Sequence, residues 1–293
     1  MPKIIIADNM KNEVIEKLKQ AGEVLTPQNE GELKSALADA DVLIVRSATK
    51  VTRDLIQNAN SLKLVLRAGV GIDNIDQQAC KEKSIIVKNT PGASTNAVAE
   101  LTISMLIGIS RKLGYLHSQM QKGEWAKKQG MGTEISGKTL AIVGLGRIGL
   151  AVAQKASALG MKIIYTDREK KNVPYQFHQS LDSLLPEADY ISLHAGIDKG
   201  APPMFQNEQF QKCKKGAYII NLARGKLIDE KALIGALNSG QIAGAALDVY
   251  ESEPYSGGLS GLSNVLLTPH VGASTSEAQL KIADELLEHI KAI

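Results

Sequence analysis

The 293-residue chain has few aromatic residues and few cysteines, and each shortage excludes a class of site. Phe, Trp and Tyr make up only 4% of the sequence, so a surface that stacks nucleic-acid bases is not expected. Its two cysteines, Cys80 and Cys213, have no second cysteine or histidine at metal-ligand spacing. We therefore expect no metal site, and two reduced core thiols in preference to a single disulfide.

The sequence also lacks a marked excess of charge and a long hydrophobic run. Lys and Arg total 34 against 31 Asp and Glu, and the resulting net charge of +3 is too small to indicate nucleic acid or an anionic membrane as a partner. No apolar run approaches the roughly 18 residues of a membrane-spanning helix. The short run at Ile4–Ala7 predicts a buried strand, not a signal peptide. These absences predict a cytoplasmic protein.

Short apolar runs alternate with amphipathic stretches along the chain, which predicts parallel sheets built from βαβ units in two domains. A first series of strands is predicted at Ile4–Ala7, Val42–Val45, Leu62–Leu66 and Ile85–Val87. A second series is predicted at Thr139–Val143, Lys162–Thr166, Tyr190–Leu193, Ala217–Asn221, Gly244–Val249 and Val265–Thr268. Between them, Ser94–Leu113 predicts one long helix, and 114–137 predicts a connector or dimer arm without regular structure.

A glycine-rich turn, Gly144-Leu-Gly146-Arg-Ile-Gly149, lies between a predicted strand and a predicted helix. In this setting Gly144 suits the tight turn, Gly146 the close approach of a pyrophosphate, and Gly149 close packing of helix on sheet. The next strand ends at Asp167, whose carboxylate suits the adenosine ribose hydroxyls and favours NAD over NADP. The neighbouring Arg168 leaves NADP as an alternative, because an arginine could hold its 2′-phosphate. A methyltransferase-type nucleotide site and a turn without a dinucleotide are the alternatives.

Three polar residues follow strands of the second series: Arg224, Glu253 and His270. Ligands of open parallel sheets bind beyond the carboxyl ends of the strands, so these side chains are expected to converge. A guanidinium holds carboxylate and carbonyl oxygens together, and an imidazole beside a carboxylate exchanges a proton with a carbonyl oxygen. The set therefore suits hydride transfer at a 2-oxo acid, although each residue taken alone is more often a surface or structural group.

Other polar residues also stand at strand ends. His194 is a candidate cofactor contact, and Asp248 suits either the nicotinamide carboxamide or the cap of a neighbouring turn. In the first series, Arg46, Arg67 and Lys88 follow three different strands. Cations clustered at one sheet edge would suit a phosphate and a carboxylate on one small substrate, unless one or more of the three points to solvent.

The sequence resembles the D-isomer-specific 2-hydroxyacid dehydrogenases over essentially its whole length. The resemblance rests on four motifs in the family's order: 144–149, Asn221-Leu-Ala-Arg-Gly225, Asp248-Val-Tyr-Glu-Ser-Glu-Pro254 and Thr268-Pro-His-Val-Gly-Ala-Ser-Thr275. It implies two flavodoxin/Rossmann-like doubly wound α/β domains with a cleft between them and a homodimer formed through the NAD domain. The substrate domain would comprise 1–93 completed by the last helix, 276–293, and the NAD domain 94–275.

The resemblance also implies residue roles. Arg224, Glu253 and His270 correspond to the family's catalytic set, with His270 as the acid/base. NAD as the cofactor would contact Gly144, Gly146, Arg147, Ile148, Gly149, Asp167, His194, Ala223, Asp248 and Gly272.

Within the family, the first domain resembles the phosphoglycerate dehydrogenase branch, through Val45-Arg-Ser-Ala-Thr-Lys50, 67–76 and Asn89-Thr-Pro91. This implies a phosphorylated 2-hydroxy or 2-oxo acid as substrate, bound by Arg46, Ser47, Arg67, Gly69 and Val70. The expected reaction is oxidation of 3-phospho-D-glycerate to 3-phosphohydroxypyruvate, in serine biosynthesis. A hydroxypyruvate or glyoxylate reductase and an NAD(H)-sensing, corepressor-like scaffold are the alternatives. The length predicts no regulatory domain.

Overall fold

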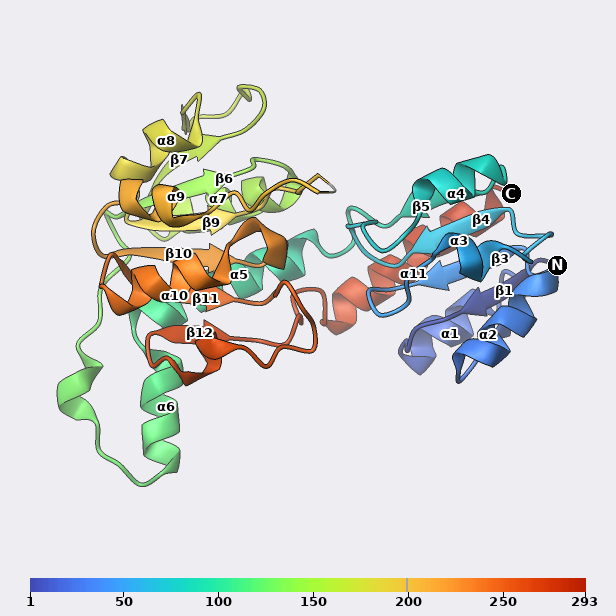
Figure 1. Cartoon of the computed structure of the whole chain (residues 1–293), viewed down its shortest axis with the longest axis horizontal. Helices are drawn as coiled ribbons and strands as arrows, with labels where there is room; N and C mark the ends of the chain where they lie inside the picture. The colour runs from blue at the N-terminus through green and yellow to red at the C-terminus, as the bar shows by residue number, and fades with distance from the viewer. Residues whose placement is uncertain (199) are drawn as a thin grey trace. The chain divides into compact units, whose positions relative to one another are not determined.

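The computed structural model describes residues 1–198 and 200–293, and the described chain divides into two compact units. Unit 1 comprises Met1–Ala97 and Ala273–Ile293, and unit 2 comprises Val98–Gly272. Each unit is built around one parallel β-sheet with helices on both faces (Figure 1). The chain therefore enters unit 2 once and returns to unit 1 for its last helix.

The sheet of unit 1 has five parallel strands in the order β2-β1-β3-β4-β5. They span Lys3–Ile6 (β1), Glu23–Leu25 (β2), Val42–Val45 (β3), Leu64–Arg67 (β4) and Ile86–Asn89 (β5). The three central strands are runs of Ile, Leu and Val because helices bury both faces of a parallel sheet. The order reverses between β1 and β3, as in flavodoxin-like folds, and ligands of such sheets bind beyond the strand ends at this switch point.

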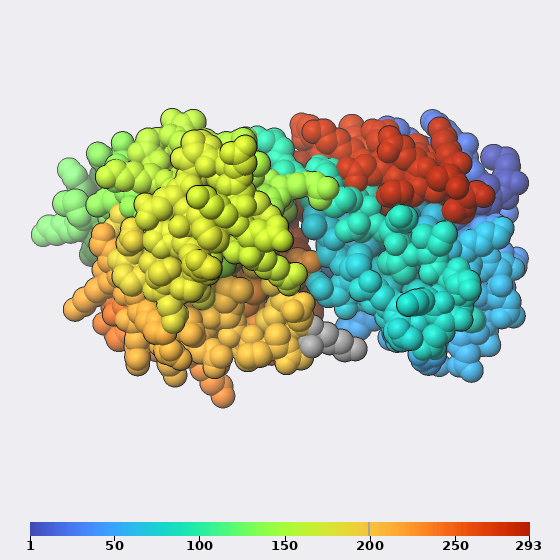
Figure 2. Space-filling view, turned by 90° about the horizontal axis from the view of Figure 1, so that it is seen from above, coloured from blue at the N-terminus to red at the C-terminus, as the bar shows by residue number. Residues whose placement is uncertain are grey.

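Two sets of helices cover the unit 1 sheet. One face packs against α1 (Asn12–Leu18) and α11 (Ser276–Lys291), and Figure 2 shows the red C-terminal helix beside the blue N-terminal segments. The other face packs against α2 (Glu30–Ala36), a 3₁₀ turn (Leu37–Asp39), α3 (Arg53–Ile56) and α4 (Gln77–Glu82). Thr275 begins α11 by accepting a hydrogen bond from the Ala278 amide, which satisfies one exposed donor of the first turn.

The sheet of unit 2 has seven parallel strands in the order β12-β11-β10-β9-β6-β7-β8. They span Thr139–Val143 (β6), Lys162–Thr166 (β7), Gln176–Phe177 (β8), Tyr190–Leu193 (β9), Ala217–Asn221 (β10), Ile242–Leu247 (β11) and Val265–Leu267 (β12). The order reverses between β6 and β9, which is the switch point of a dinucleotide-binding fold. The predicted doubly wound α/β class is thus confirmed in both units.

Helices also cover both faces of the unit 2 sheet. One apolar layer includes α5 (Thr95–Ser110) and α7 (Arg147–Ala158). The other includes α8 (Leu181–Leu184), α9 (Asn207–Lys212) and α10 (Glu230–Asn238). Short 3₁₀ turns lie at Leu185–Glu187, Gly225–Leu227 and Gly258–Gly261. Gly149 and Ala153 on α7 are fully or nearly buried, so this helix lies close to the strands that carry the glycine-rich turn.

The segment after α5 differs from the sequence prediction. The expected single helix to Leu113 is interrupted, because α5 ends at Ser110 and Lys112 has a left-handed backbone with φ of 54°. A second helix, α6 (Leu113–Gln121), and a 3₁₀ turn (Lys127–Gly130) follow where no regular structure was expected. This α6 arm, defined as residues 113–131, exposes 78% of Trp125 and 82% of Met131.

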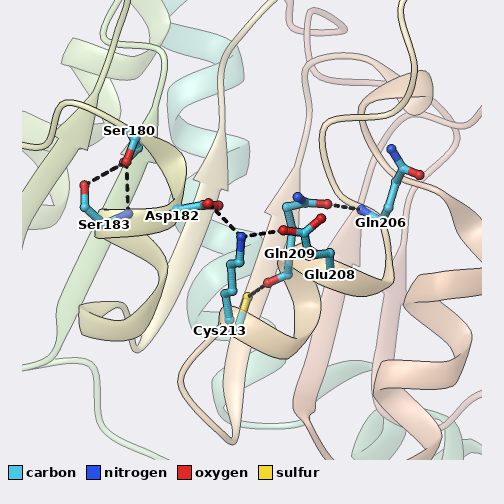
Figure 3. A network of polar contacts seen from close by, with 8 residues as sticks. Ser180, Asp182, Ser183, Gln206, Glu208, Gln209 and Cys213 are labelled. Atoms are coloured by element: carbon cyan, nitrogen blue, oxygen red, sulfur yellow. Dashed lines mark hydrogen bonds and ion pairs between the residues drawn. The ribbon is translucent and has the colours of Figure 1, made fainter.

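Cys80 and Cys213 are free and buried, which confirms the prediction of core thiols. Burial raises the pKa of Cys80 to about 11 and that of Cys213 to about 12. The Cys213 thiol donates to the Gln209 carbonyl oxygen at 3.3 Å (Figure 3). The neighbouring residue, Lys212, joins α9 to α8 through a hydrogen bond of 2.6 Å to Asp182. Both thiols remain protonated near neutral pH and are poor nucleophiles.

No helix in the described ranges is both long and apolar enough to cross a membrane. Within the same ranges, no group of three or more His, Cys, Asp or Glu side chains is arranged to hold a metal ion.

Candidate active site

The glycine-rich turn joins β6 to α7 at the switch point of unit 2. Gly144 has φ of 92°, and a Cβ there would lie 2.9 Å from the His194 carbonyl carbon. A Cβ on Gly149 would lie 2.2 Å from the Gly144 carbonyl oxygen, so this position also excludes a side chain. By contrast, a Cβ on Gly146 would meet no atom within 4 Å. Two glycines therefore form the turn, and the third leaves open space at the start of α7.

That open space fits a pyrophosphate. Arg147 and Ile148 form the first turn of α7, which has no side-chain cap, so its amides and the positive end of the helix dipole face an open position. Asp167, directly after β7, accepts hydrogen bonds from the amides of Leu145 at 2.8 Å and of Arg168 at 2.7 Å. Its carboxylate is therefore fixed beside the turn, where ribose hydroxyls of a dinucleotide would be recognised.

His194 directly follows β9, on the other side of the switch point from β6. Its amide donates to the Val143 carbonyl at 2.8 Å, and its Nε2 lies 2.8 Å from the Ser192 hydroxyl. Burial lowers the pKa of His194 to about 4, so the ring is neutral near physiological pH. The backbone of residues 194 and 195 forms the wall against which Gly144 packs.

Arg224 lies in the loop that follows β10. The buried Asn221 holds this loop: its Oδ1 accepts from the Ala223 amide at 3.0 Å and its Nδ2 donates to the Arg224 carbonyl at 2.9 Å. A Cβ on Gly225 would lie only 1.9 Å from the Tyr250 carbonyl carbon. The loop after β10 is therefore packed directly against the loop after β11.

Glu253 and His270 form a hydrogen-bonded pair at the ends of β11 and β12. Glu253 Oε2 lies 2.8 Å from His270 Nδ1, and Glu253 Oε1 accepts from the Tyr250 amide at 3.1 Å. The Glu253 and His270 side chains are 35% and 42% exposed, so the pair is accessible to a small molecule. A carboxylate on Nδ1 fixes the tautomer and the orientation of the ring.

Asp248 is buried and holds the loop that carries His270. Its Oδ1 accepts from the Thr268 hydroxyl at 2.6 Å and from the Val271 amide at 2.8 Å. Its Oδ2 accepts from the Gly272 amide at 2.8 Å. His270 itself has φ of 53°, a conformation that needs such external support in a residue with a side chain. Of the two roles considered for Asp248, the structure shows the turn cap.

In unit 1, the loop after β3 is organised by Asp8, which follows β1. The Asp8 carboxylate accepts from the Arg46 amide, from the Thr49 amide at 3.0 Å and from the Thr49 hydroxyl at 2.6 Å. The Arg46 guanidinium donates to the Asn9 carbonyl at 3.2 Å, and Ser47 is exposed. Arg46 and Ser47 thus lie at the switch point between β1 and β3.

Arg67 ends the neighbouring strand, β4, and bends back over the next turn. Gly69 has φ of 145°, and a Cβ there would lie 1.4 Å from Arg67 Nη1, so this glycine leaves room for the guanidinium in its observed position. The Val70 carbonyl accepts from Asn89 Nδ2 at 2.5 Å, which fixes the turn to the end of β5. Lys88 is paired with Leu66 in the sheet and therefore points to the face opposite Arg67, so the expected cluster of three cations does not form.

Each predicted site residue has a place in one of the two units. The structure brings Arg224, Glu253 and His270 to the ends of three adjacent strands, β10, β11 and β12. The glycine-rich turn, Asp167 and His194 lie at the ends of β6, β7 and β9 in the same sheet. Three residues that support the site, Asp8, Tyr250 and Thr268, were not predicted from the sequence. Asp8 and Tyr250 directly follow predicted strands and Thr268 is the last residue of another, and that position was the available signal.

Comparison with known proteins places this geometry in a family. Residues 103–272 match the family model described as D-isomer specific 2-hydroxyacid dehydrogenase, NAD binding domain. The chain is 44% identical over 301 residues to a D-3-phosphoglycerate dehydrogenase of Methanocaldococcus jannaschii, covering 100% of this chain and 57% of the relative. It is also 44% identical over 265 residues to a hydroxypyruvate reductase of Thermotoga maritima, covering 88% of this chain and 86% of the relative.

Solved structures of similar fold include enzymes that reduce 2-oxo acids. An NADPH-dependent glyoxylate/hydroxypyruvate reductase from Sinorhizobium meliloti, in complex with NADP and malonate, superposes with a TM-score of 0.90 at 28% identity, covering 99% of this chain and 93% of that one. The chain spans about half the length of the phosphoglycerate dehydrogenases that it matches.

Proposed function

Because the chain belongs to the D-isomer specific 2-hydroxyacid dehydrogenase family, we propose that it interconverts 3-phospho-D-glycerate and 3-phosphohydroxypyruvate with NAD. The observation that carries the proposal is the 2.8 Å pair of His270 and Glu253 at a strand end adjacent to that of Arg224. A proton donor with a fixed ring and a planar cation are the two groups that reduction of a 2-oxo acid requires.

In the proposed mechanism, Arg224, His270 and Glu253 each have one role. Arg224 binds the carboxylate and the carbonyl oxygen of the 2-oxo acid through its parallel donors and holds C2 in position. His270 Nε2 donates a proton to that oxygen in reduction and removes it in oxidation. Glu253 stabilises the imidazolium through Nδ1. When bound, the nicotinamide cofactor would supply the hydride acceptor for oxidation at C2 and the hydride donor for the reverse reaction.

We propose that unit 2 holds the cofactor. The first-turn amides of Arg147 and Ile148 would bind the pyrophosphate above Gly146, and Asp167 would accept from the adenosine ribose. A carboxylate at this position repels a 2′-phosphate, which favours NAD over NADP. The backbones of His194, Ala223 and Gly272 would line the remaining length of the cofactor.

Unit 1 is proposed to supply the phosphate contacts, through Arg46, Ser47, Arg67, Gly69 and Val70. Arg46→Ala is expected to raise KM for 3-phosphohydroxypyruvate about tenfold or more and to change KM for hydroxypyruvate less than threefold. The reason is that a charge-assisted hydrogen bond to a phosphate contributes about 1.5–3 kcal/mol, which an unphosphorylated substrate does not use. Steady-state kinetics with both substrates measures this, and equal effects on both would remove Arg46 from the phosphate site.

One assay tests the proposed activity: initial rates of NADH and NADPH oxidation with a panel of 2-oxo acids. We expect the highest kcat/KM with 3-phosphohydroxypyruvate and NADH. A preference for hydroxypyruvate or glyoxylate would identify a reductase of the kind found in Thermotoga maritima. Tight NADH binding without turnover on any member of the panel would instead favour an NAD(H)-sensing scaffold.

We further propose a homodimer formed through unit 2. The α6 arm exposes Met120, Trp125 and Met131, and large apolar side chains clustered on one segment are typical of an interface. Trp125→Glu is expected to shift the sedimentation coefficient from that of a dimer to that of a monomer. A wild-type protein that sediments as a monomer at micromolar concentration would contradict the proposal.

A further inference from the structure

The phenol of Tyr250 lies between the ends of two strands that carry the proposed catalytic pair. Its hydroxyl is 2.9 Å from the Thr268 carbonyl oxygen, directly after β12, and 3.1 Å from the Leu247 carbonyl oxygen, at the end of β11. The hydroxyl has one proton and donates it to either oxygen. Burial, reinforced by the nearby charge of Asp248, raises the pKa of Tyr250 to about 12, so this proton is retained throughout the physiological range.

The backbone of Tyr250 contacts Glu253, in its own loop after β11, and the neighbouring loop that carries Arg224. Its amide donates to Glu253 Oε1 at 3.1 Å, and its carbonyl group packs against Gly225, next to Arg224. One residue thus touches the Glu253 carboxylate, the loop of Arg224 and the loop of His270. The three loops follow different strands, so no covalent bond fixes the distances between them. Tyr250 links them directly through its hydroxyl and its backbone.

The ring of Tyr250 is itself held in place. It stacks on Tyr255, with ring centroids 4.3 Å apart and an interplanar angle of 20°. The Tyr255 hydroxyl donates to Glu230 Oε1 at 2.8 Å and accepts from the Leu259 amide at 3.0 Å, which fixes the second ring to α10. The phenol of Tyr250 is therefore a rigid donor that reaches the strand ends from a packed layer.

We propose that Tyr250 is a positioning residue for the reaction, whose hydroxyl sets the loop of His270 against the loop of Glu253. The inference rests on the proposed dehydrogenase function. It goes beyond that function by assigning a role to a side chain that would touch neither substrate nor cofactor. Asp248 holds the same loop through the Thr268 hydroxyl and the amides of Val271 and Gly272. Tyr250 adds a hydrogen bond to the Thr268 carbonyl, at the start of the turn that carries His270.

Tyr250→Phe tests the proposal because it removes the hydroxyl and keeps the ring stack. We expect kcat with 3-phosphohydroxypyruvate to fall about tenfold, as the loss of one hydrogen bond predicts, with Kd for NADH within twofold of wild type. The primary isotope effect with NADH deuterated at the transferred position is expected to rise, because a displaced imidazole makes the chemical step more rate-limiting. A mere loss of folded protein lowers the rate without moving the isotope effect.

The matched control is Tyr255→Phe, which makes the same change in the same stack without touching a strand-end carbonyl. It should keep kcat within twofold and leave the isotope effect unchanged.

Hydrogen exchange of peptides covering 265–275, followed by mass spectrometry without substrate, should be faster in Tyr250→Phe alone. This readout is independent of turnover, so an inactive wild type would refute the proposed function and still leave the exchange test decisive. Wild-type exchange and isotope effect in Tyr250→Phe, or equal changes in both variants, would overturn the inference.

Discussion

Replacing His270 with phenylalanine is expected to lower kcat by about 10²–10⁴-fold, which is the contribution of a positioned general acid/base. Kd for NADH is expected to stay within about twofold, because the glycine-rich turn and Asp167 lie at other strand ends. Phenylalanine keeps the planar ring and removes both nitrogens, so the proton donor and the partner of Glu253 are lost together. Turnover of 3-phosphohydroxypyruvate and quenching of intrinsic fluorescence by NADH measure the two effects.

The control for this variant is His117→Phe, an identical change at an exposed position on α6. It should leave kcat unchanged. A His270→Phe protein with more than about a tenth of wild-type turnover would contradict the acid/base role of His270. A fall in kcat together with a large loss of NADH affinity would instead indicate that the loop of Asp248 and Gly272 had been disturbed.

Arg224→Lys is expected to lower kcat/KM for the 2-oxo acid by about 100-fold. The substitution keeps the charge, but an ammonium cannot give two parallel hydrogen bonds to a carboxylate and a carbonyl oxygen. Each hydrogen bond to a charged group contributes about 1.5–3 kcal/mol, and about 1.4 kcal/mol corresponds to a factor of ten. Asn221 and Gly225 keep the loop in place because they hold its backbone and not its guanidinium.

Arg53→Lys is the matched control, since Arg53 is 63% exposed and pairs with Glu82 on the surface of unit 1. Surface pairs of this kind contribute little, so kcat/KM should not change. If Arg224→Lys retained wild-type kcat/KM, a point charge would suffice at this position and the proposed bidentate contact would be wrong. Restoration of activity by added guanidinium to an Arg224→Ala protein would support it.

The central strands were predictable because they are buried on both faces. Thr139–Val143, Lys162–Thr166, Tyr190–Leu193 and Ala217–Asn221 were predicted to the residue, since a helix-covered parallel sheet selects a continuous apolar run. The edge strands Glu23–Leu25 and Gln176–Phe177 were missed. They are three and two residues long and are only partly buried, so tertiary pairing and not local composition defines them.

The break between α5 and α6 was not predictable from local signals. Lys112 adopts a left-handed conformation that glycine and asparagine usually occupy, and no proline marks the end of α5. The residues proposed to contact substrate and cofactor were predictable, because polar residues that follow apolar parallel strands meet at one edge of the sheet. Among the residues that support it, the turn cap by Asp248 was one of the two roles predicted. The hydrogen bonds of the Tyr250 hydroxyl were not predictable, because they depend on the register of β12 against β11.

The return of the last helix to unit 1 has a consequence for synthesis on the ribosome. Ile282, Leu286 and Ile290 of α11 complete the apolar layer on one face of β1, β3 and β4. Until α11 has been translated, this face of the unit 1 sheet is not fully buried. By then every helix and strand of unit 2 has already been synthesised. Unit 2 can therefore finish folding first, against the usual N-to-C order, and the emerging first sheet is the part that most needs protection from aggregation.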